Sequence, residues 1–151
     1  MLGHSFPTRR SSDLSLAGWR SLFEACRERA HEVQPGLADE LASDIVLNVN
    51  RTSLVNFQNS LLAYQHQPVG VDCVFSGAPT GDANALAWLG RVSTQGPGLP
   101  GLPGATLATQ QIQVSATAAG FNRVQITICW RGPTDTAMRH HTVVTYVNGL
   151  V

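Results

Sequence analysis

The chain has 151 residues, with ten basic and ten acidic residues, so its formal net charge is zero. A protein that binds nucleic acid through the phosphates needs a basic excess on one face, and this balance argues against that class. Hydrophobic residues make up 43% of the chain, enough for a packed core in a single domain. No apolar run approaches the roughly 20 residues that a membrane span requires.

The first residues stand apart from the rest of the chain. Residues 4–14 resemble, residue for residue, the translation of a common sequencing adapter. The alternative is a basic targeting peptide built on the arginine pair within this stretch, but no apolar segment follows that pair. We therefore expect residues 1–14 to be non-native, residues 15–50 to form a long helix and residues 51–151 to form the remaining head.

Apolar residues recur at spacings of three and four throughout residues 15–50, a pattern that predicts an amphipathic helix. Pro35 interrupts the pattern. Because proline lacks a backbone donor and clashes with the preceding turn, we expect a kink or a break there. A straight helix of this length would measure roughly 54 Å, more than a small domain covers. Either the helix folds back at Pro35, or its N-terminal half protrudes.

The rest of the chain divides into two short helices and three strands. Helical spacing predicts helices over residues 54–64 and 82–92. Alternation of apolar and polar residues predicts strands over residues 111–115, 123–130 and 142–147. Three successive strands joined by loops favour an antiparallel meander, covered on one face by the long helix. The expected fold class is therefore α+β.

Two segments between these elements are expected to be loops: residues 65–79, which are irregular, and residues 95–104, whose short Gly-Leu-Pro repeat suits a stiff surface linker. The search for catalytic and metal-binding residues finds none. His140 and His141 are adjacent, and neighbours on a strand point apart, so they do not chelate one ion together. No glycine-rich loop leads from a strand into a helix, as a phosphate cradle requires. We expect no cofactor.

The three cysteines lie in different settings. Cys26 falls on the apolar stripe of the long helix, where a buried free thiol is expected. Cys73 lies in a loop and Cys129 in a strand, and none of the three belongs to a Cys-Xaa-Xaa-Cys unit of the kind found at zinc or redox sites. Cys73 and Cys129 either form a disulfide in an oxidising compartment or remain unpaired in a cytosolic protein.

Three stretches carry a resemblance to a known family. Residues 41–51 read Leu-Ala-Ser-Asp-Ile-Val-Leu-Asn-Val-Asn-Arg, residues 83–88 read Ala-Asn-Ala-Leu-Ala-Trp, and residues 124–131 read Val-Gln-Ile-Thr-Ile-Cys-Trp-Arg. In this order they resemble the end of the spine helix, an Asp-Leu-Ala-Glu-Trp motif and the penultimate strand of the minor pilins of type IV pili. The group that they resemble is PilV, the type IV pilus modification proteins.

The resemblance implies a pilin-like fold, in which a long N-terminal spine helix packs on a small antiparallel sheet. The residues that would form this helix–sheet packing are Leu37, Leu41, Ile45, Val49, Ile126, Ile128 and Trp130. The residues that would contact neighbouring subunits are Leu16, Trp19, Phe23 and Cys26. The resemblance also implies secretion into an oxidising periplasm, which suits a disulfide between Cys73 and Cys129.

The function that the resemblance implies is assembly or modification of the type IV pilus, a structural role without catalysis. The expected partners are other pilins and the pilus assembly machinery, with the membrane engaged through an N-terminal segment absent from this sequence. The expected location is the inner membrane with a periplasmic head, and then the pilus. Two alternatives stay open: a minor pseudopilin of a type II secretion system, and a fragment of an unrelated enzyme or binding module.

Overall fold

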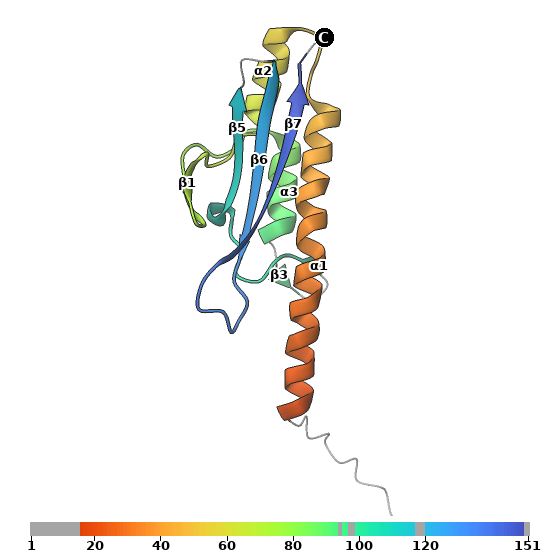
Figure 1. The fold of residues 1–151 in the computed structure, drawn as a ribbon, viewed down its shortest axis with the longest axis vertical. Coiled ribbons are helices and arrows are strands. Elements are labelled where there is room, and N and C mark those ends of the chain that lie inside the picture. The colour runs from red at the N-terminus through yellow and green to blue at the C-terminus, as the bar shows by residue number, and fades with distance from the viewer. Residues whose placement is uncertain (1–15, 94, 97–98, 117–119, 150–151) are drawn as a thin grey trace, which may run out of the picture.

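A computed structural model describes residues 16–93, 95–96, 99–116 and 120–149 (Figure 1). Helices and antiparallel strands are both present, and the three strands of the main sheet follow all the helices, so the predicted α+β class is confirmed at that level. The predicted non-native segment, residues 1–14, lies outside the described residues.

The helices and strands of the structure follow the order along the chain that the sequence predicted. The helices are α1 (Leu16–Asn48), α2 (Leu54–Ala63), α3 (Ala83–Ser93) and the 3-10 turn η1 (Leu107–Thr109). The strands are β1 (Val69–Val71), β2 (Val74–Ser76), β3 (Gln95–Gly96), β4 (Leu99–Pro100), β5 (Gln110–Ala116), β6 (Phe121–Trp130) and β7 (Arg139–Asn148). Both predicted short helices and all three predicted strands are therefore present.

Helix α1 runs continuously through Pro35, so of the two expectations at this proline the break is absent. Proline removes one helical hydrogen bond, and the bonds of the flanking turns keep the helix continuous. The turns after Pro35 are also held by packing, because Ala38 and Leu41 are fully buried. Figure 1 shows the consequence: the N-terminal turns of α1 extend well beyond the end of the sheet.

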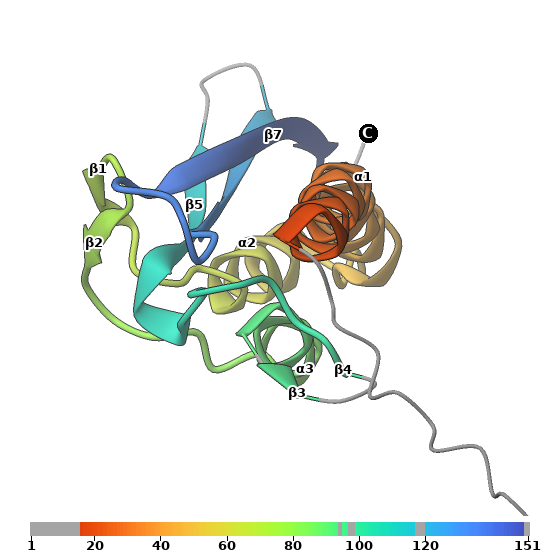
Figure 2. The same ribbon diagram turned by 90° about the horizontal axis from the view of Figure 1, so that it is seen from below.

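The main sheet has three antiparallel strands in the order β5-β6-β7, which is the predicted meander. Its register brings Ile126 of β6 opposite Ile112 of β5 and Val143 of β7. Because side chains alternate across a strand, these three side chains face the same side of the sheet, as does every second residue along each strand. Figure 2 shows the three helices gathered on one side of the sheet, with α1 beside β7.

The core lies between these helices and the sheet. It contains six of the seven residues proposed for helix–sheet packing as buried side chains, and the seventh, Leu37, packs against it partly buried. The six are Leu41, Ile45, Val49, Ile126, Ile128 and Trp130. Helix α1 contacts β6, β7 and α3, so this cluster joins the N-terminal and C-terminal parts of the chain.

The two segments expected to be loops contain short hairpins. Strands β1 and β2 pair as an antiparallel hairpin within residues 65–79, and β3 pairs with β4 within residues 95–104. The turn of the first hairpin places Asp72 and Cys73 at φ values of 53° and 65°, a region that non-glycine residues seldom adopt. Strands of two or three residues are too short to give a periodic signal, so the sequence did not predict them.

Candidate functional site

The structure joins the two cysteines that the resemblance paired. Cys73, in the turn between β1 and β2, and Cys129, in β6, form a disulfide with an S–S distance of 2.04 Å and a Cα–Cα distance of 5.8 Å. Both residues are buried. The disulfide fastens the small hairpin to the central strand of the main sheet.

The other sequence-based candidates do not converge on a site. Positions 16, 19, 23 and 26, proposed for subunit contact, lie on α1, and their side chains fall outside the described residues. His140 is exposed and its neighbour His141 is half-buried, as alternation along β7 requires. Among the described residues no group of three or more His, Cys, Asp or Glu side chains is placed to hold a metal ion.

A polar groove lies between α1 and α3, and we call it the α1–α3 groove. Its volume is about 360 Å³. Side chains from both helices line it: Glu40, Leu41, Ser43, Asp44, Leu47, Asn84, Ala87, Trp88 and Arg91. Charged groups of both signs and an aromatic ring therefore surround one concave surface, a composition that ordinary core packing does not produce.

An ion pair spans this groove. The Nη2 atom of Arg91 on α3 lies 2.6 Å from the Oε1 atom of Glu40 on α1. Both side chains are about half exposed, at 48% and 54%, so water weakens the pair. A weak surface ion pair adds little to stability, and its two partners are available to a ligand of matching charge.

A second acidic group of the groove is held by hydrogen bonds. The hydroxyl of Tyr64 donates to Oδ2 of Asp44 over 3.1 Å, and the side-chain amide of Asn48 donates to Oδ1 of the same carboxylate. Burial, reinforced by the neighbouring carboxylates of Asp82 and Asp44, raises the pKa of Tyr64 to about 12. Tyr64 therefore remains a protonated donor at neutral pH and fixes the orientation of Asp44.

A cap defines the start of α3, and a second contact places this helix against α1. Oδ1 of Asp82 accepts hydrogen bonds from the backbone N–H groups of Asn84 and Ala85, each 2.9 Å long, and so caps the start of α3. Further along the helix, Nε1 of Trp88 donates to the carbonyl oxygen of Leu37 over 2.8 Å. The aromatic ring is buried at the floor of the groove and fixes the distance between the helices.

The groove pairs a cation with carboxylates across a small concave space. A guanidinium binds a carboxylate through two parallel hydrogen bonds, and a carboxylate accepts from an ammonium group. Arg91 on one side and Glu40 and Asp44 on the other therefore suit a small zwitterion. Sequence reasoning missed this site, although the i, i+4 spacing of Glu40 and Asp44 on one helix face was a usable signal.

Comparison with known proteins gives partial matches to one enzyme family. The chain is 51% identical over 45 residues to homoserine kinases of Rhodopseudomonas palustris (strain TIE-1) and Bradyrhizobium diazoefficiens, and 48% identical over 44 residues to that of Mesorhizobium japonicum. The first two matches cover 30% of this chain and the third 29%. The chain spans 14% of the length of these kinases. No family model and no solved structure matches.

These matches correct the functional prediction. A stretch about half identical to homoserine kinases points to an enzyme family, so the predicted structural role in the pilus and the predicted absence of enzymatic function are wrong. The type II pseudopilin alternative falls with them. In the described part of the chain, no helix combines the length and apolar character of a membrane span.

Three expectations are untested by these findings. The resemblance of residues 41–51, 83–88 and 124–131 to minor pilins stays a prediction, since no comparison bears on it. The expected pilin partners and the expected location also stay predictions.

Proposed function

We propose that the α1–α3 groove binds a small hydroxy-amino acid of the homoserine type, as part of chemistry related to that of homoserine kinases. The observation that carries the proposal is the placement of Arg91 opposite Glu40 and Asp44 around one groove of about 360 Å³. The partial identity to homoserine kinases supports the choice of amino acid. Since the chain spans 14% of the kinases' length, the proposal is centred on binding of the substrate.

Binding would exchange one ion pair for two. The carboxylate of the amino acid would accept hydrogen bonds from Arg91, and Glu40 would turn from Arg91 to the ammonium group of the ligand. Asp44 would supply a second acceptor, already oriented by Tyr64. The side-chain hydroxyl would reach the polar end of the groove, where Asn84 offers an amide. Pre-orientation of one acceptor lowers the entropy that the ligand must lose on binding.

The test is calorimetric titration of the full chain with homoserine, backed by amide chemical shifts from NMR. Replacing Arg91 with Gln, or Asp44 with Asn, should weaken binding roughly 10-fold or more, because hydrogen bonds to charged groups contribute about 1.5–3 kcal/mol. The matched control is Arg123→Gln, which removes an arginine of β6 outside the groove. Equal affinity in the Arg91 variant and the control would overturn the proposal.

Two modified ligands separate the charged contacts. The methyl ester of homoserine lacks the carboxylate and should lose its dependence on Arg91, while N-acetylhomoserine lacks the ammonium group and should lose its dependence on Asp44. Incubation with ATP, magnesium and homoserine then measures phosphorylation directly. Phosphohomoserine that forms with the parent chain and not with the Arg91 variant would extend the proposal from binding to transfer.

We also propose that the chain folds in an oxidising compartment. The buried disulfide between Cys73 and Cys129 supports this location, because such bonds form and persist where thiols are not kept reduced. The pilin-like assignment of the fold likewise stays a proposal. Its support is the long helix α1 lying on an antiparallel sheet, an arrangement that other α+β domains also use.

A further inference from the structure

Strand β7 is an edge of the main sheet. It pairs with β6 along one side, from Asn148 opposite Phe121 to Arg139 opposite Trp130. Within the described residues no strand pairs with its other side. An edge strand presents a row of backbone donors and acceptors that can pair with another extended chain, and natural proteins usually protect such edges with charged residues or proline. Apart from Arg139 at its first position, β7 contains neither.

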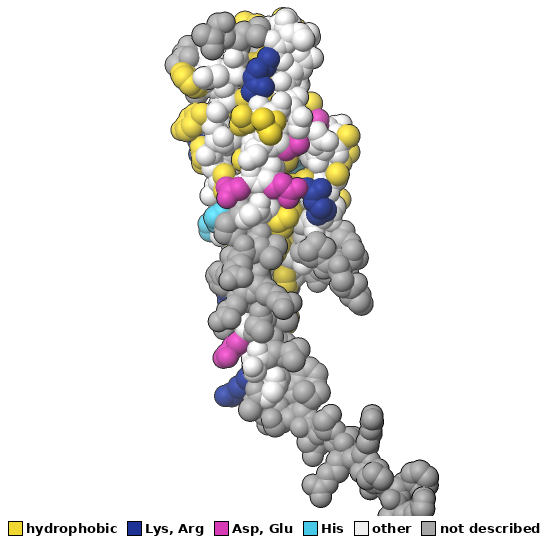
Figure 3. Space-filling model, turned by 90° about the vertical axis from the view of Figure 1, so that its right-hand side faces the viewer, with side chains coloured by type: hydrophobic (Ala, Val, Ile, Leu, Met, Phe, Trp, Pro, Cys, Tyr) yellow, Lys and Arg dark blue, Asp and Glu magenta, His cyan; other side chains and the backbone are white. Residues whose placement is uncertain are grey.

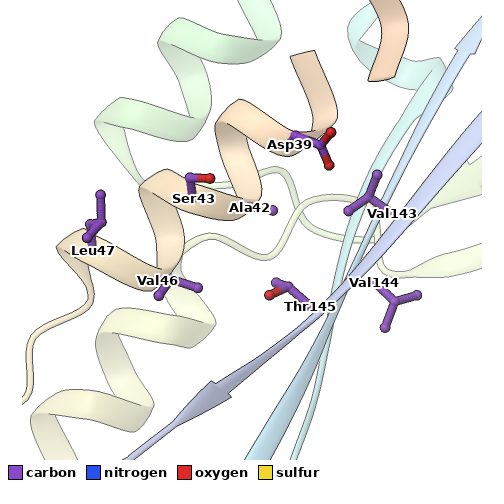
Figure 4. A pocket seen from close by; sticks show the side chains of 8 residues that line it. All are labelled: Asp39, Ala42, Ser43, Val46, Leu47, Val143, Val144 and Thr145. Atoms are coloured by element: carbon purple, nitrogen blue, oxygen red, sulfur yellow. The ribbon is translucent and has the colours of Figure 1, made fainter. Parts of the chain in front are cut away.

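This edge borders a second groove, between α1 and β7, which we call the β7 groove. Its volume is about 530 Å³. The residues that line it are Asp39, Ala42, Ser43, Val46 and Leu47 of α1 and Val143, Val144 and Thr145 of β7. Figure 4 shows Ala42 and Val46 of the helix opposite Val143 and Thr145 of the strand, whereas Leu47 and Val144 point away from the space between them. The side chains of Ala42 and Ser43 are small, so they leave space between α1 and the strand.

The charge and polarity of the β7 groove define what fits it. Asp39 is exposed and is the charged residue in the lining, and no basic side chain lines the groove. Leu47 is 77% exposed, and Val144, on the outer face of β7, is 42% exposed, so apolar surface is open at the rim of the groove. Figure 3 views the side of the molecule on which α1 lies and shows apolar side chains close to acidic ones there.

A second copy of the chain does not fit this edge. Two β7 strands that pair antiparallel about a two-fold axis keep the same face of the joined sheet on the same side. The partner's own α1 would then stand on the face, and beside the edge, where the first α1 already lies. An occupant without a flanking helix avoids this clash.

We propose that the β7 groove binds an extended peptide segment of a partner protein, which adds a fourth strand beside β7. Backbone hydrogen bonds to the edge would supply affinity, as in other cases of strand addition. Alternate small β-branched side chains would pack toward Ala42 and Val46, and a basic side chain would lie near Asp39. Pairing with β7 requires that the partner's backbone is extended. The carboxylate of Asp39 favours a positively charged side chain on the partner.

The test uses the full chain, labelled for NMR, and the probe peptide acetyl-Lys-Thr-Val-Thr-Val-Thr-amide. We expect chemical-shift changes confined to β7 and to the lining residues of α1. The matched peptide with Glu in place of Lys should bind roughly three-fold more weakly, the scale of one exposed charge pair. Asp39→Lys should reverse this preference, whereas Glu24→Lys, the same reversal of charge at an exposed position of α1 outside the groove, should leave it unaltered.

A backbone control distinguishes strand addition from loose apolar contact. The same peptide with alternate backbone nitrogens methylated keeps its side chains and loses half of its donors, so it should not bind at β7. Equal binding of the methylated and unmethylated peptides, or shifts that spare β7, would overturn the proposal. Light scattering of the chain alone measures its oligomeric state. A dimer whose interface maps to β7 would show that a second copy occupies the groove, and it would overturn the proposal of a peptide partner.

Discussion

The indole nitrogen of Trp88 donates a 2.8 Å hydrogen bond to the carbonyl oxygen of Leu37, two residues after Pro35 in α1. A carbonyl oxygen has two acceptor sites, so it can serve the helix and this indole together. Trp88 is 1% exposed, and the contact therefore joins α3 to α1 inside the core. It supports the long helix close to the position where proline removes one of its own hydrogen bonds.

Replacing Trp88 with Phe should lower the free energy of unfolding by about 1 kcal/mol, because the ring is largely kept and the hydrogen bond is lost. Replacing it with Ala should lower that free energy by about 3–5 kcal/mol, since a large cavity opens in the core. Urea unfolding followed by circular dichroism measures both. Leu86→Ala on the same helix is the control, as Leu86 is 48% exposed; equal losses at the two positions would contradict this account.

The stability of the fold should fall at high pH through Tyr64. The pKa of this residue is raised from 10.0 to about 12, chiefly by burial, so the native state favours the protonated phenol. The corresponding stabilisation is complete below pH 10 and is lost as the pH rises toward 12, with a total of roughly 2–3 kcal/mol. Unfolding measured between pH 8 and 12 should show this decline in the parent chain. A Tyr64→Phe variant should show a shallower decline over the same range, and parallel curves would exclude Tyr64 as the cause.

Replacing Ile126 with Asp should unfold the domain. Ile126 is fully buried in β6 between Ile112 and Val143, and an unpaired carboxylate in that place costs several kcal/mol. The control is Val144→Asp on the outer face of β7, which should remain folded because the side chain there is 42% exposed. Circular dichroism and gel filtration compare the two variants. A soluble Ile126→Asp variant with a normal melting curve would mean that the inner face of the sheet is assigned wrongly.

Reducing the disulfide should destabilise the chain by about 4 kcal/mol, the value that loop entropy gives for a closed loop of this length. The bond joins residues separated by 56 positions, Cys73 and Cys129. Alkylation of the unfolded, unreduced chain followed by mass spectrometry should modify one thiol, that of Cys26. Alkylation after reduction should modify three. Three modified thiols before reduction would show that the disulfide had not formed.

The fold was largely predictable because its signals are local. Periodicity was sufficient to place α2, α3 and the three long strands, since an apolar stripe or alternation survives in 7 to 11 residues. The outcome at Pro35 was not predictable in this way. Whether a helix continues past a proline depends on what holds the next turn. Here the burial of Ala38 and Leu41 and the hydrogen bond from Trp88 of α3 hold it.

The candidate sites were less accessible to sequence reasoning. The α1–α3 groove combines Glu40 and Asp44 with Arg91, more than 45 positions further along the chain, and only the packing of α3 on α1 brings them together. The β7 groove depends on the backbone of an edge strand, and whether a strand lies at an edge is set by sheet order rather than by its residues. The functional prediction failed for a different reason. The short motifs indicate how a helix packs on a sheet, and the same packing occurs in proteins with different functions.

The covalent link between the small hairpin and the central strand also determines how the chain responds to force. If the folded protein is pulled from its two ends, residues between Cys73 and Cys129 cannot extend, because the disulfide bypasses them. At about 3.5 Å per residue, the 56-position separation shortens the fully extended chain by roughly 200 Å relative to a chain without the disulfide. The whole of α3 and β5 and nearly all of β6 lie inside that loop. Tension would therefore draw out α1, α2 and β7, while the centre of the domain stays tied together as one mechanical unit.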